Sequence, residues 1–323
     1  MKQHRLGILV AGLLITGTAS AVAQTQTPTI TDLARGKFTG PISIDVKDTS
    51  DVVMNRVVYD ANGVGNTWHS HPLHYVTVKT GSITIHRGDA NGCTSKTYTA
   101  GQSYEEPAGA HVHEGSLDVS LYVTYVGVPV GGAIAKDETA PTGPNCPSKL
   151  TTGLARTELS RSTIQGASSA ATTGDSEMFM QAVTVPGKTN FRSSWYSSPA
   201  ALYASTKSGA LTVYTASGTS CTSKTYAAGQ GLFVPKDQAI FVRNEGSAPA
   251  EVYATRLGLP VGAAPRVDAP NPGGANCPDI SAAATPAPAT NLPRTGGPAG
   301  ALLLLGFGMT GVGTVLRGVT RRR

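Results

Sequence analysis

Charged side chains are scarce in this sequence of 323 residues: Asp, Glu, Lys and Arg make up 14% of it, and aromatic residues only 6%. Long surface helices need many Glu and Lys residues, so this scarcity disfavours a helical protein. Glycine and proline are frequent instead, with 38 and 21 residues. The composition favours turn-rich β structure, and the length is sufficient for two domains that each bury a core.

The formal net charge of +6 comes from the two ends of the chain. Lys2 and Arg5 lie near the N-terminus, Arg317 and Arg321–Arg323 lie near the C-terminus, and neither end has an acidic residue. The segment 24–295 therefore carries no formal net charge. Because nucleic-acid binding needs a basic face on the folded part, we expect no nucleic-acid partner.

Cysteine is also rare, with four residues and no CxxC pair of the kind used for zinc binding or thiol exchange. The N-terminus has the features of a secretory signal peptide: a basic start, an apolar run from Leu6 to Ile15, and small residues up to Ala23, with cleavage before Gln24. An N-terminal membrane anchor is the alternative, but the apolar run is short for a bilayer.

The C-terminus reads Leu-Pro-Arg-Thr-Gly at 292–296, followed by 18 uncharged residues from Ala299 to Leu316 and then by Arg321–Arg323. This arrangement resembles the LPxTG sorting signal of Gram-positive wall proteins. The resemblance implies that a sortase cuts between Thr295 and Gly296 and joins Thr295 to the cell-wall peptidoglycan. The alternative is a single-pass membrane anchor that leaves the domains outside the cell, because the apolar segment is long enough to span a bilayer.

Two segments of the chain repeat each other in order and spacing. GCTSKTYTAGQ at 92–102 matches SCTSKTYAAGQ at 220–230, and LYVTYVGVPVGG at 121–132 matches VYATRLGLPVGA at 252–263. Each repeat ends in Asn-Cys-Pro, at 145–147 and 276–278. The chain is therefore one domain copied once.

The cysteines occupy equivalent places in the two repeats, so we predict one disulfide within each repeat. Pairing across the repeats is the alternative, and it would require the repeats to exchange their tails. The predicted bridges are Cys93–Cys146 and Cys221–Cys277.

Each repeat contains short segments rich in Val, Thr, Tyr and Ile, separated by glycines, and no segment with helical periodicity. This pattern predicts a β-sandwich or barrel. The predicted strands are 52–59, 75–79, 82–86, 96–99 and 119–126 in the first repeat, and 179–185, 202–206, 211–214, 239–243 and 251–256 in the second.

All histidines except His4, in the signal peptide, lie in the first repeat: His69, His71, His74, His86, His111 and His113. On a strand, residues two apart point to the same face, so His69 with His71 and His111 with His113 form two same-face pairs. Two such pairs in one domain predict a site for a divalent transition metal, namely Zn, Fe, Ni, Cu or Mn.

The spacing of these residues resembles the two metal-binding motifs of the cupin superfamily, and the sequence around His69 is similar to that of small exported bacterial cupin proteins. The first motif is carried by Gly63, His69, His71 and Gly81, and the second by Gly101, Pro107, Gly109 and His111 or His113. The resemblance covers residues 40–278. It implies an all-β fold of two tandem double-stranded β-helix (cupin, or jelly-roll) barrels, with metal ligands from the two histidines and the Glu of the first motif and the His of the second.

The first repeat departs from this pattern. The place of the glutamate holds His74, and the second motif has two histidines and no Asn. An all-histidine site is therefore expected: His69, His71, His74 and one of His111 or His113. Either Glu105 or Glu106 could supply a carboxylate, but both are expected on the strand surface, as is His86.

The expected organisation follows from these features. In the second repeat Tyr196 and Ser198 stand where His69 and His71 stand in the first, so that barrel should bind no transition metal there. The layout is a signal peptide at 1–23, a metal-binding barrel at 24–150, a barrel without ligands at 151–280, a Pro/Ala-rich linker at 281–291 and the sorting signal at 292–323.

Three functions fit this organisation, and the fold does not choose among them. We favour a cell-surface metal-binding protein, because no arginine clamp, paired acids or nucleophile with a base accompanies the histidines. The first alternative is a metal-dependent dioxygenase, isomerase or decarboxylase acting on a small extracellular substrate. The second is a module that binds a sugar or another small molecule.

Overall fold

The computed structural model describes residues 27–59, 67–89, 91–106, 109–116, 118–147, 154–187 and 194–278. The regular elements in these ranges are all strands, and no helix in this part of the chain is long and apolar enough to cross a membrane. The predicted signal peptide and the sorting signal, including Thr295 and Gly296, lie outside these ranges.

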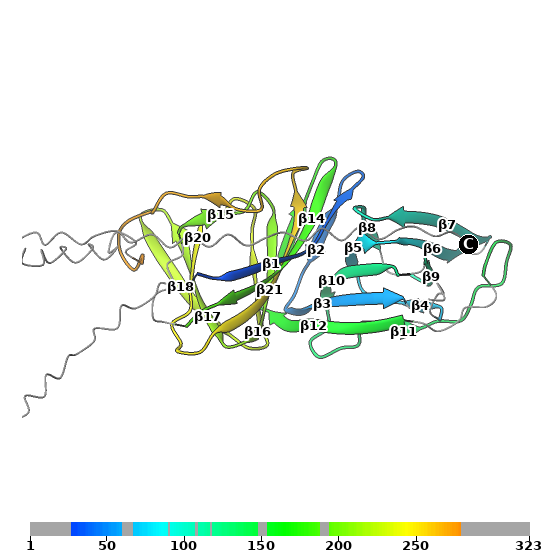
Figure 1. The fold of residues 1–323 in the computed structure, drawn as a ribbon, viewed down its shortest axis with the longest axis horizontal. Coiled ribbons are helices and arrows are strands. Elements are labelled where there is room, and N and C mark those ends of the chain that lie inside the picture. Colours follow the sequence, from blue (N-terminus) through cyan, green and yellow to red (C-terminus); the bar gives the residue numbers. More distant parts are fainter. Residues whose placement is uncertain are drawn as a thin grey trace, which may run out of the picture. The chain divides into compact units, whose positions relative to one another are not determined.

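The strands of the two repeats follow the same order (Figure 1). Those of the first repeat are β1 (Thr29–Phe38), β2 (Ser43–Val46), β3 (Ser50–Tyr59), β4 (His69–Ser70), β5 (His74–Thr80), β6 (Ser82–Asp89), β7 (Gly92–Thr99), β8 (Ser103–Glu106), β9 (His111–Gly115), β10 (Ser120–Val128) and β11 (Lys136–Asp137). Those of the second are β12 (Leu154–Ile164), β13 (Ser168–Ala171), β14 (Ser176–Val185), β15 (Tyr196–Ser197), β16 (Ala201–Ser208), β17 (Ala210–Ser217), β18 (Ser220–Ala227), β19 (Gln230–Val234), β20 (Ile240–Arg243), β21 (Ala250–Leu259) and β22 (Val267–Asp268).

Each barrel consists of two five-stranded sheets. In the first barrel one sheet has the strand order β12-β3-β10-β5-β8, and it packs against a sheet with the order β11-β4-β9-β6-β7. In the second barrel the two sheets have the orders β1-β14-β21-β16-β19 and β18-β17-β20-β15-β22. Parallel pairing of β12 with β19 joins one sheet of each barrel into a ten-stranded sheet. The predicted all-β fold of two tandem double-stranded β-helix barrels is confirmed.

The first strand of each repeat belongs to the barrel of the other repeat. Strand β1 pairs antiparallel with β14, from Thr29↔Thr184 to Phe38↔Ser176, and β12 pairs in the same way with β3, from Leu154↔Tyr59 to Ile164↔Ser50. Figure 1 shows β1 among the strands of the second barrel and β12 beside β3. The predicted boundary at residue 150 therefore divides the sequence repeats but not the strands of the two barrels.

The three largest of the apolar clusters among the described residues hold the fold together. One fills the first barrel and includes Val53 and Ile83, and a second fills the second barrel and includes Leu211 and Val252. The third lies between the barrels and is built from Phe38, Ile42, Ile44, Val52, Met54, Tyr75, Val126, Ile164, Met178, Met180, Ala201, Tyr203, Tyr253 and Leu257. The barrels therefore share a continuous apolar interface as well as strands.

The turn after β5 and its counterpart after β16 need glycine. Gly81 has φ +72° and Gly209 has φ +71°, a region that side chains other than glycine rarely adopt. A Cβ on Gly81 would also lie 2.9 Å from the Cα of Val119, and one on Gly209 would lie 2.8 Å from the Cα of Ala250. The same turn is thus fixed for the same reason in both barrels.

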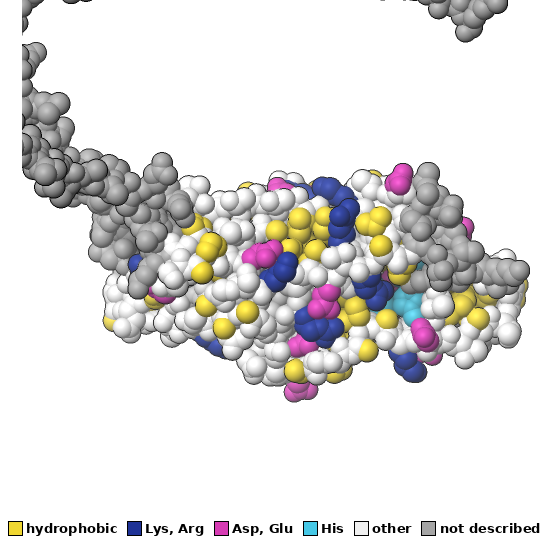
Figure 2. All heavy atoms as spheres, turned by 60° about the horizontal axis from the view of Figure 1, so that its bottom comes forward, with side chains coloured by type: hydrophobic (Ala, Val, Ile, Leu, Met, Phe, Trp, Pro, Cys, Tyr) yellow, Lys and Arg dark blue, Asp and Glu magenta, His cyan; other side chains and the backbone are white. Residues whose placement is uncertain are grey.

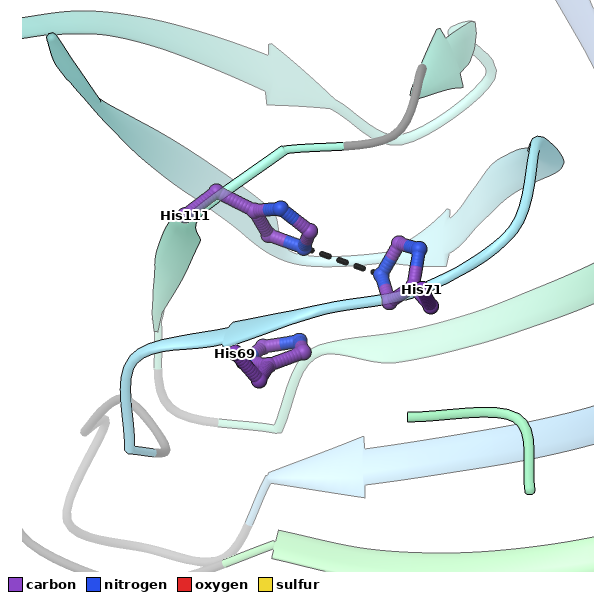
Figure 3. Close-up of side chains that lie close together, drawn as sticks. All are labelled: His69, His71 and His111. Carbon is purple, nitrogen blue, oxygen red and sulfur yellow. Dashed lines mark hydrogen bonds between the residues drawn. The ribbon is translucent and has the colours of Figure 1, made fainter. Parts of the chain in front are cut away.

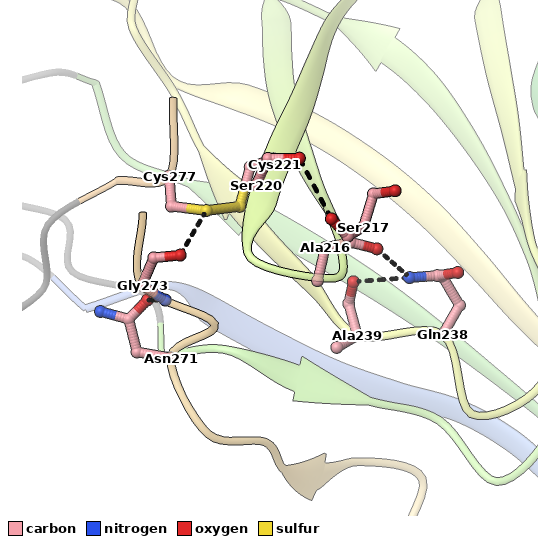
Figure 4. Close-up of a disulfide and its surroundings, with 9 residues drawn as sticks. All are labelled: Ala216, Ser217, Ser220, Cys221, Gln238, Ala239, Asn271, Gly273 and Cys277. Carbon is pink, nitrogen blue, oxygen red and sulfur yellow. Dashed lines mark hydrogen bonds between the residues drawn. A yellow bond between two sulfur atoms is a disulfide. The ribbon is translucent and has the colours of Figure 1, made fainter. Parts of the chain in front are cut away.

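Both predicted disulfides are confirmed: Cys93 is bonded to Cys146, and Cys221 to Cys277. The second bridge packs beside Trp195 and Phe241, and the turn around it is closed by hydrogen bonds such as that from Ser220 Oγ to the Ser217 carbonyl (Figure 4). The first bridge links β7 to the end of the first repeat, and the second links β18 to the end of the second repeat.

Candidate metal centre

Strands β4, β5 and β9 of the first barrel bring the predicted histidines together, and β8 adds a glutamate. Strand β4 carries His69, which pairs with His111 on β9, and β5 begins at His74, which pairs with Glu106 at the end of β8. His113 follows His111 by two residues, so both rings point into the barrel. His69, His71, His74, His111 and His113 are all buried, with exposed fractions between 1% and 8%.

Backbone carbonyls fix the orientation of three of the imidazole rings. The Nδ1 atoms of His69, His71 and His111 donate to the carbonyl oxygens of Thr67 at 2.8 Å, Pro72 at 3.2 Å and Gly109 at 2.7 Å. A carbonyl oxygen only accepts hydrogen bonds, so Nδ1 carries the proton in each ring. Each Nε2 therefore keeps its lone pair, as in rings that bind a metal.

Two of these lone pairs face each other. The Nε2 atoms of His71 and His111 are 2.9 Å apart, the contact drawn as a dashed line in Figure 3, with the His69 ring beside them. Because neither Nε2 carries a proton, the contact is unfavourable unless a cation or an added proton lies there. Ligand atoms of His69, His71 and His111 all lie within 4.8 Å of one another, close enough to hold one ion.

Glu106 is also part of this cluster, which corrects the expectation that it lies on the strand surface. It is fully buried, and its Oε2 lies 2.9 Å from Nε2 of His74 and 3.1 Å from Nε2 of His113. Its Oε1 lies 3.6 Å from Nε2 of His111. The cluster is therefore not all-histidine, because a carboxylate from β8 lies among the imidazoles.

Burial keeps His69, His71, His74 and His111 neutral near pH 7 by lowering their pKa values. Burial lowers the pKa of His69 from 6.5 to about 4 and that of His111 to about 3. Burial, together with the neighbouring His74 and His111, lowers the pKa of His71 further. Burial would raise the pKa of Glu106, but His113 and His74 together hold it well below its usual value. Neutral imidazoles around one carboxylate are a donor set that suits divalent Zn, Fe, Mn, Ni or Cu.

The space beside the cluster is small. The cavity beside the cluster measures about 20 Å³, and its lining includes four of the histidines and three tyrosines: His69, His71, His74, His113, Tyr59, Tyr104 and Tyr125. Tyr125 stacks on His74 with ring centroids 4.9 Å apart, which holds that ring in place. A cavity of this size accommodates one ion or one water molecule, not an organic compound.

The exchanged strand β12 contributes to the same cavity. Leu154 and Arg156, which belong to the second repeat, line it together with the histidines. Arg156 is exposed and is close enough to influence the pKa values of His69 and Tyr125. The centre of the first barrel is thus completed by side chains that come from the other repeat.

A larger depression adjoins the site at the surface. It measures about 430 Å³, is lined by residues of the β4 and β9 ends such as Ser70 and Ala110, and shares His71 with the inner cavity. Its rim carries Lys136 and Glu138, which pair at 3.2 Å, and Glu138 also accepts a hydrogen bond from Ser70. Figure 2 shows acidic and basic side chains interspersed on one face of the molecule, with histidine atoms reaching the surface at one point.

His86 does not join the cluster. Its ring lies on β6, 3.2 Å from the Glu114 carboxylate and 2.7 Å from the Ser95 hydroxyl. The expectation that it is an exposed strand residue is only partly correct, since 12% of the side chain is exposed. Its neighbours are polar surface groups, so it has no part in the candidate site.

The second barrel has the same frame with a different interior. The pair Leu202↔Val234 corresponds to His74↔Glu106, and Tyr196↔Ile240 corresponds to His69↔His111. Val242, opposite Val213, takes the place of His113, opposite Ile85. Ser198 takes the place of His71. The second barrel therefore has no histidine or carboxylate at any of the six positions that hold the five histidines and Glu106 in the first barrel.

No family model matches the chain, and no curated protein matches it. Solved structures of oxalate decarboxylase from Bacillus subtilis are similar: the structure at pH 4.6 has 14% identity and a TM-score of 0.32, covering 73% of this chain and 78% of that one. A point mutant of the same enzyme has 14% identity and a TM-score of 0.33, covering 73% and 80%. Likeness at this level assigns no activity, and the fold described above follows from the strand order of this chain itself.

The sequence prediction named Glu106 as a possible carboxylate but placed it on the strand surface, and it did not name Arg156. Glu106 could have been found from strand periodicity: Tyr104 is an aromatic residue that faces the core, and Glu106, two residues later, must share its face. Arg156 offered no such signal. It lies in the second repeat, and only the exchange of strands brings it to the first barrel.

Proposed function

We propose that the first barrel binds one divalent transition-metal ion, with ligands drawn from His69, His71, His74, Glu106, His111 and His113. The observation that carries this proposal is the convergence of unprotonated Nε2 atoms, in particular those of His71 and His111 at 2.9 Å. A cation between such lone pairs converts a repulsive contact into two coordinate bonds. The carbonyls behind His69, His71 and His111 are the outer contacts that such ligands use to hold their orientation.

A purely structural role for the cluster fits less well. Buried polar groups are stabilised when each donor meets an acceptor. Here burial lowers the pKa values of His71 and His111, so near neutral pH neither ring gains the second proton that would turn the contact between their Nε2 atoms into a hydrogen bond. A metal ion satisfies all of these atoms at once.

The size of the cavity favours binding over catalysis. Because the cavity beside the cluster measures only about 20 Å³, a substrate would have to reach the ion from the outer depression of about 430 Å³, past His71. The alternative, a metal-dependent dioxygenase, isomerase or decarboxylase, depends on that approach. A module that binds a sugar or another small molecule would use the same depression without the metal.

The proposed place of action is the cell surface. The signal peptide and the LPxTG signal at 292–296 support export and sortase-mediated attachment to peptidoglycan. The two disulfides also favour an oxidising compartment outside the cytoplasm. Wall-degrading enzymes should then release the protein from cells, and detergent alone should not.

Elemental analysis tests the metal proposal directly. The purified chain is stripped with a chelator, incubated separately with Zn, Mn, Fe(II), Ni and Cu salts, desalted and analysed. We expect close to one ion per chain for at least one of these metals. Failure to retain any of them would refute the proposal. Oxygen consumption and carbon dioxide release by the loaded protein, tested with small organic acids, then separate the binding protein from the dioxygenase and the decarboxylase.

A further inference from the structure

The interior of the second barrel contains a buried arginine where the first barrel has Tyr125. Arg256 occupies the position on β21 that Tyr125 occupies on β10, as the shared pairing of the neighbouring Thr124 with Tyr75 and of Thr255 with Tyr203 shows. Tyr125 faces the interior of its barrel. Arg256 points the same way and is only 6% exposed.

The hydrogen bonds of Arg256 give it no direct contact with a carboxylate among the described residues. Its Nη1 donates to the Gln181 side-chain oxygen at 2.8 Å, and Gln181 in turn donates to Asp32 of the exchanged strand β1 at 2.7 Å. Among the described residues no carboxylate contacts Arg256 itself, and its buried Nε has no hydrogen-bond partner there. A buried charge and an unpaired buried donor are both costly, so this arrangement is incomplete without an anion.

A second guanidinium lies nearby. The Arg266 guanidinium lies 4.0 Å from the Tyr196 ring centre and is held by hydrogen bonds to the hydroxyl and carbonyl of Ser194, at 2.5 and 3.3 Å. Burial raises the pKa of Tyr196, while Arg256 and Arg266 both act to lower it. Two positive groups therefore act on one end of the barrel, in a region where the interior is otherwise apolar.

We infer that the second barrel is a binding site for a small oxyanion, held by Arg256. With Nη1 engaged by Gln181, the edge formed by Nε and Nη2 remains, and this is the edge that binds two oxygens of a carboxylate, sulfate or phosphate. The metal proposed for the first barrel has no part in this site. The second repeat is thus a ligand-binding half with a chemistry of its own.

Calorimetric titration of the purified chain at constant ionic strength tests this inference, with sodium acetate, sulfate and phosphate as separate probes against a chloride background. We expect one site for at least one of them, and the three probes tell an organic carboxylate from an inorganic oxyanion. Arg256→Met should weaken that binding roughly 10- to 100-fold, because it removes a charge-assisted pair of hydrogen bonds. Arg256→Lys should weaken it as well, since an ammonium lacks the two-pronged edge.

The matched control is Arg243→Gln, which removes an equal charge from the same barrel at an exposed position that pairs with Glu245. It should leave anion binding unchanged, and Arg256→Met should leave the metal content of the first barrel unchanged. Equal binding by wild type and Arg256→Met would overturn the inference. If the variants fail to fold, the wild-type titration decides alone: no binding of any of the three anions refutes the site.

Discussion

The two barrels share a backbone frame and differ almost completely in what they enclose. Equivalent strands pair in equivalent registers, and equivalent glycines turn between them. Yet the first interior holds five histidines and a glutamate, whereas the second holds Leu202, Val234, Ile240 and Val242 at four of these places. The comparison shows that the barrel closes without the ligands. Closure of a barrel with this frame therefore does not require histidines at these positions.

The largest effect is expected from removing the proposed metal ligands of the first barrel. The double change His69→Ala and His71→Ala should reduce the metal content from close to one ion per chain to nearly none, because it removes two of the converging Nε2 atoms. The matched change Tyr196→Ala and Ser198→Ala in the second barrel should leave the metal content unaffected. Elemental analysis of both variants checks this, and equal metal content in the two would remove the proposed difference between the barrels.

The disulfides test what the two barrels have in common, because loss of either bridge should destabilise the protein by a similar amount. Replacing both cysteines of either bridge with serine should lower the free energy of unfolding by about 4 kcal/mol, since the closed loops are of nearly equal length, 53 and 56 residues. The loss should be somewhat greater for the second bridge, because Cys221 packs against Trp195 and Phe241. Denaturant unfolding measures both values, and a several-fold difference between them would contradict the shared frame.

A smaller effect is expected at the carboxylate. Glu106→Gln should weaken metal binding roughly 10- to 100-fold, since it removes the negative charge but keeps the shape of the side chain. Glu105→Gln, the neighbouring residue on the opposite face of β8, should change the affinity little. Competition with a chelator of known affinity gives both values. Similar losses in the two variants would show that Glu106 acts through the strand and not at the metal.

The smallest effect concerns pH. In the metal-free protein burial lowers the pKa of His69 to about 4, so between pH 6.5 and 4 the unfolded chain binds more protons than the folded one. Stability should therefore fall as the pH falls through this window, with His69 alone accounting for about 1 kcal/mol between pH 7 and pH 5.5. Denaturant unfolding with a chelator present measures the slope. The His69→Ala and His71→Ala variant should show a shallower slope, and an equal slope would place the titrating groups elsewhere.

Much of the fold could be predicted because its signals are local. Alternating apolar residues, turn glycines and the repeated CTSKTY segment locate ten strands, both bridges and the barrel class. The exchange of β1 and β12 could not be predicted for a physical reason. The two repeats are similar, so each first strand finds nearly equivalent partners in either barrel, and strand patterns alone do not say which one it joins.

The candidate site also combines residues that local sequence signals predict with residues that they do not. His69, His71, His74, His111 and His113 follow from spacing and from the cupin resemblance, because residues two apart on a strand share a face. Which of His111 and His113 faces the cluster was left open, and both do. Glu106 was misplaced on the surface because a carboxylate is rarely buried, and only its bonds to His74 and His113 make burial favourable.

Because β1 and β12 are exchanged between the barrels, the two repeats should stay together even without the covalent connection at residues 148–153. Ladders of backbone hydrogen bonds and a shared apolar cluster join the two repeats, independently of that connection. A chain cut there should stay assembled as a heterodimer of two half-chains, each completing the barrel of the other, and separately produced halves should complement one another. The molecule therefore has the arrangement of a domain-swapped dimer within a single polypeptide. Removal of either repeat would take one strand from the barrel of the other repeat.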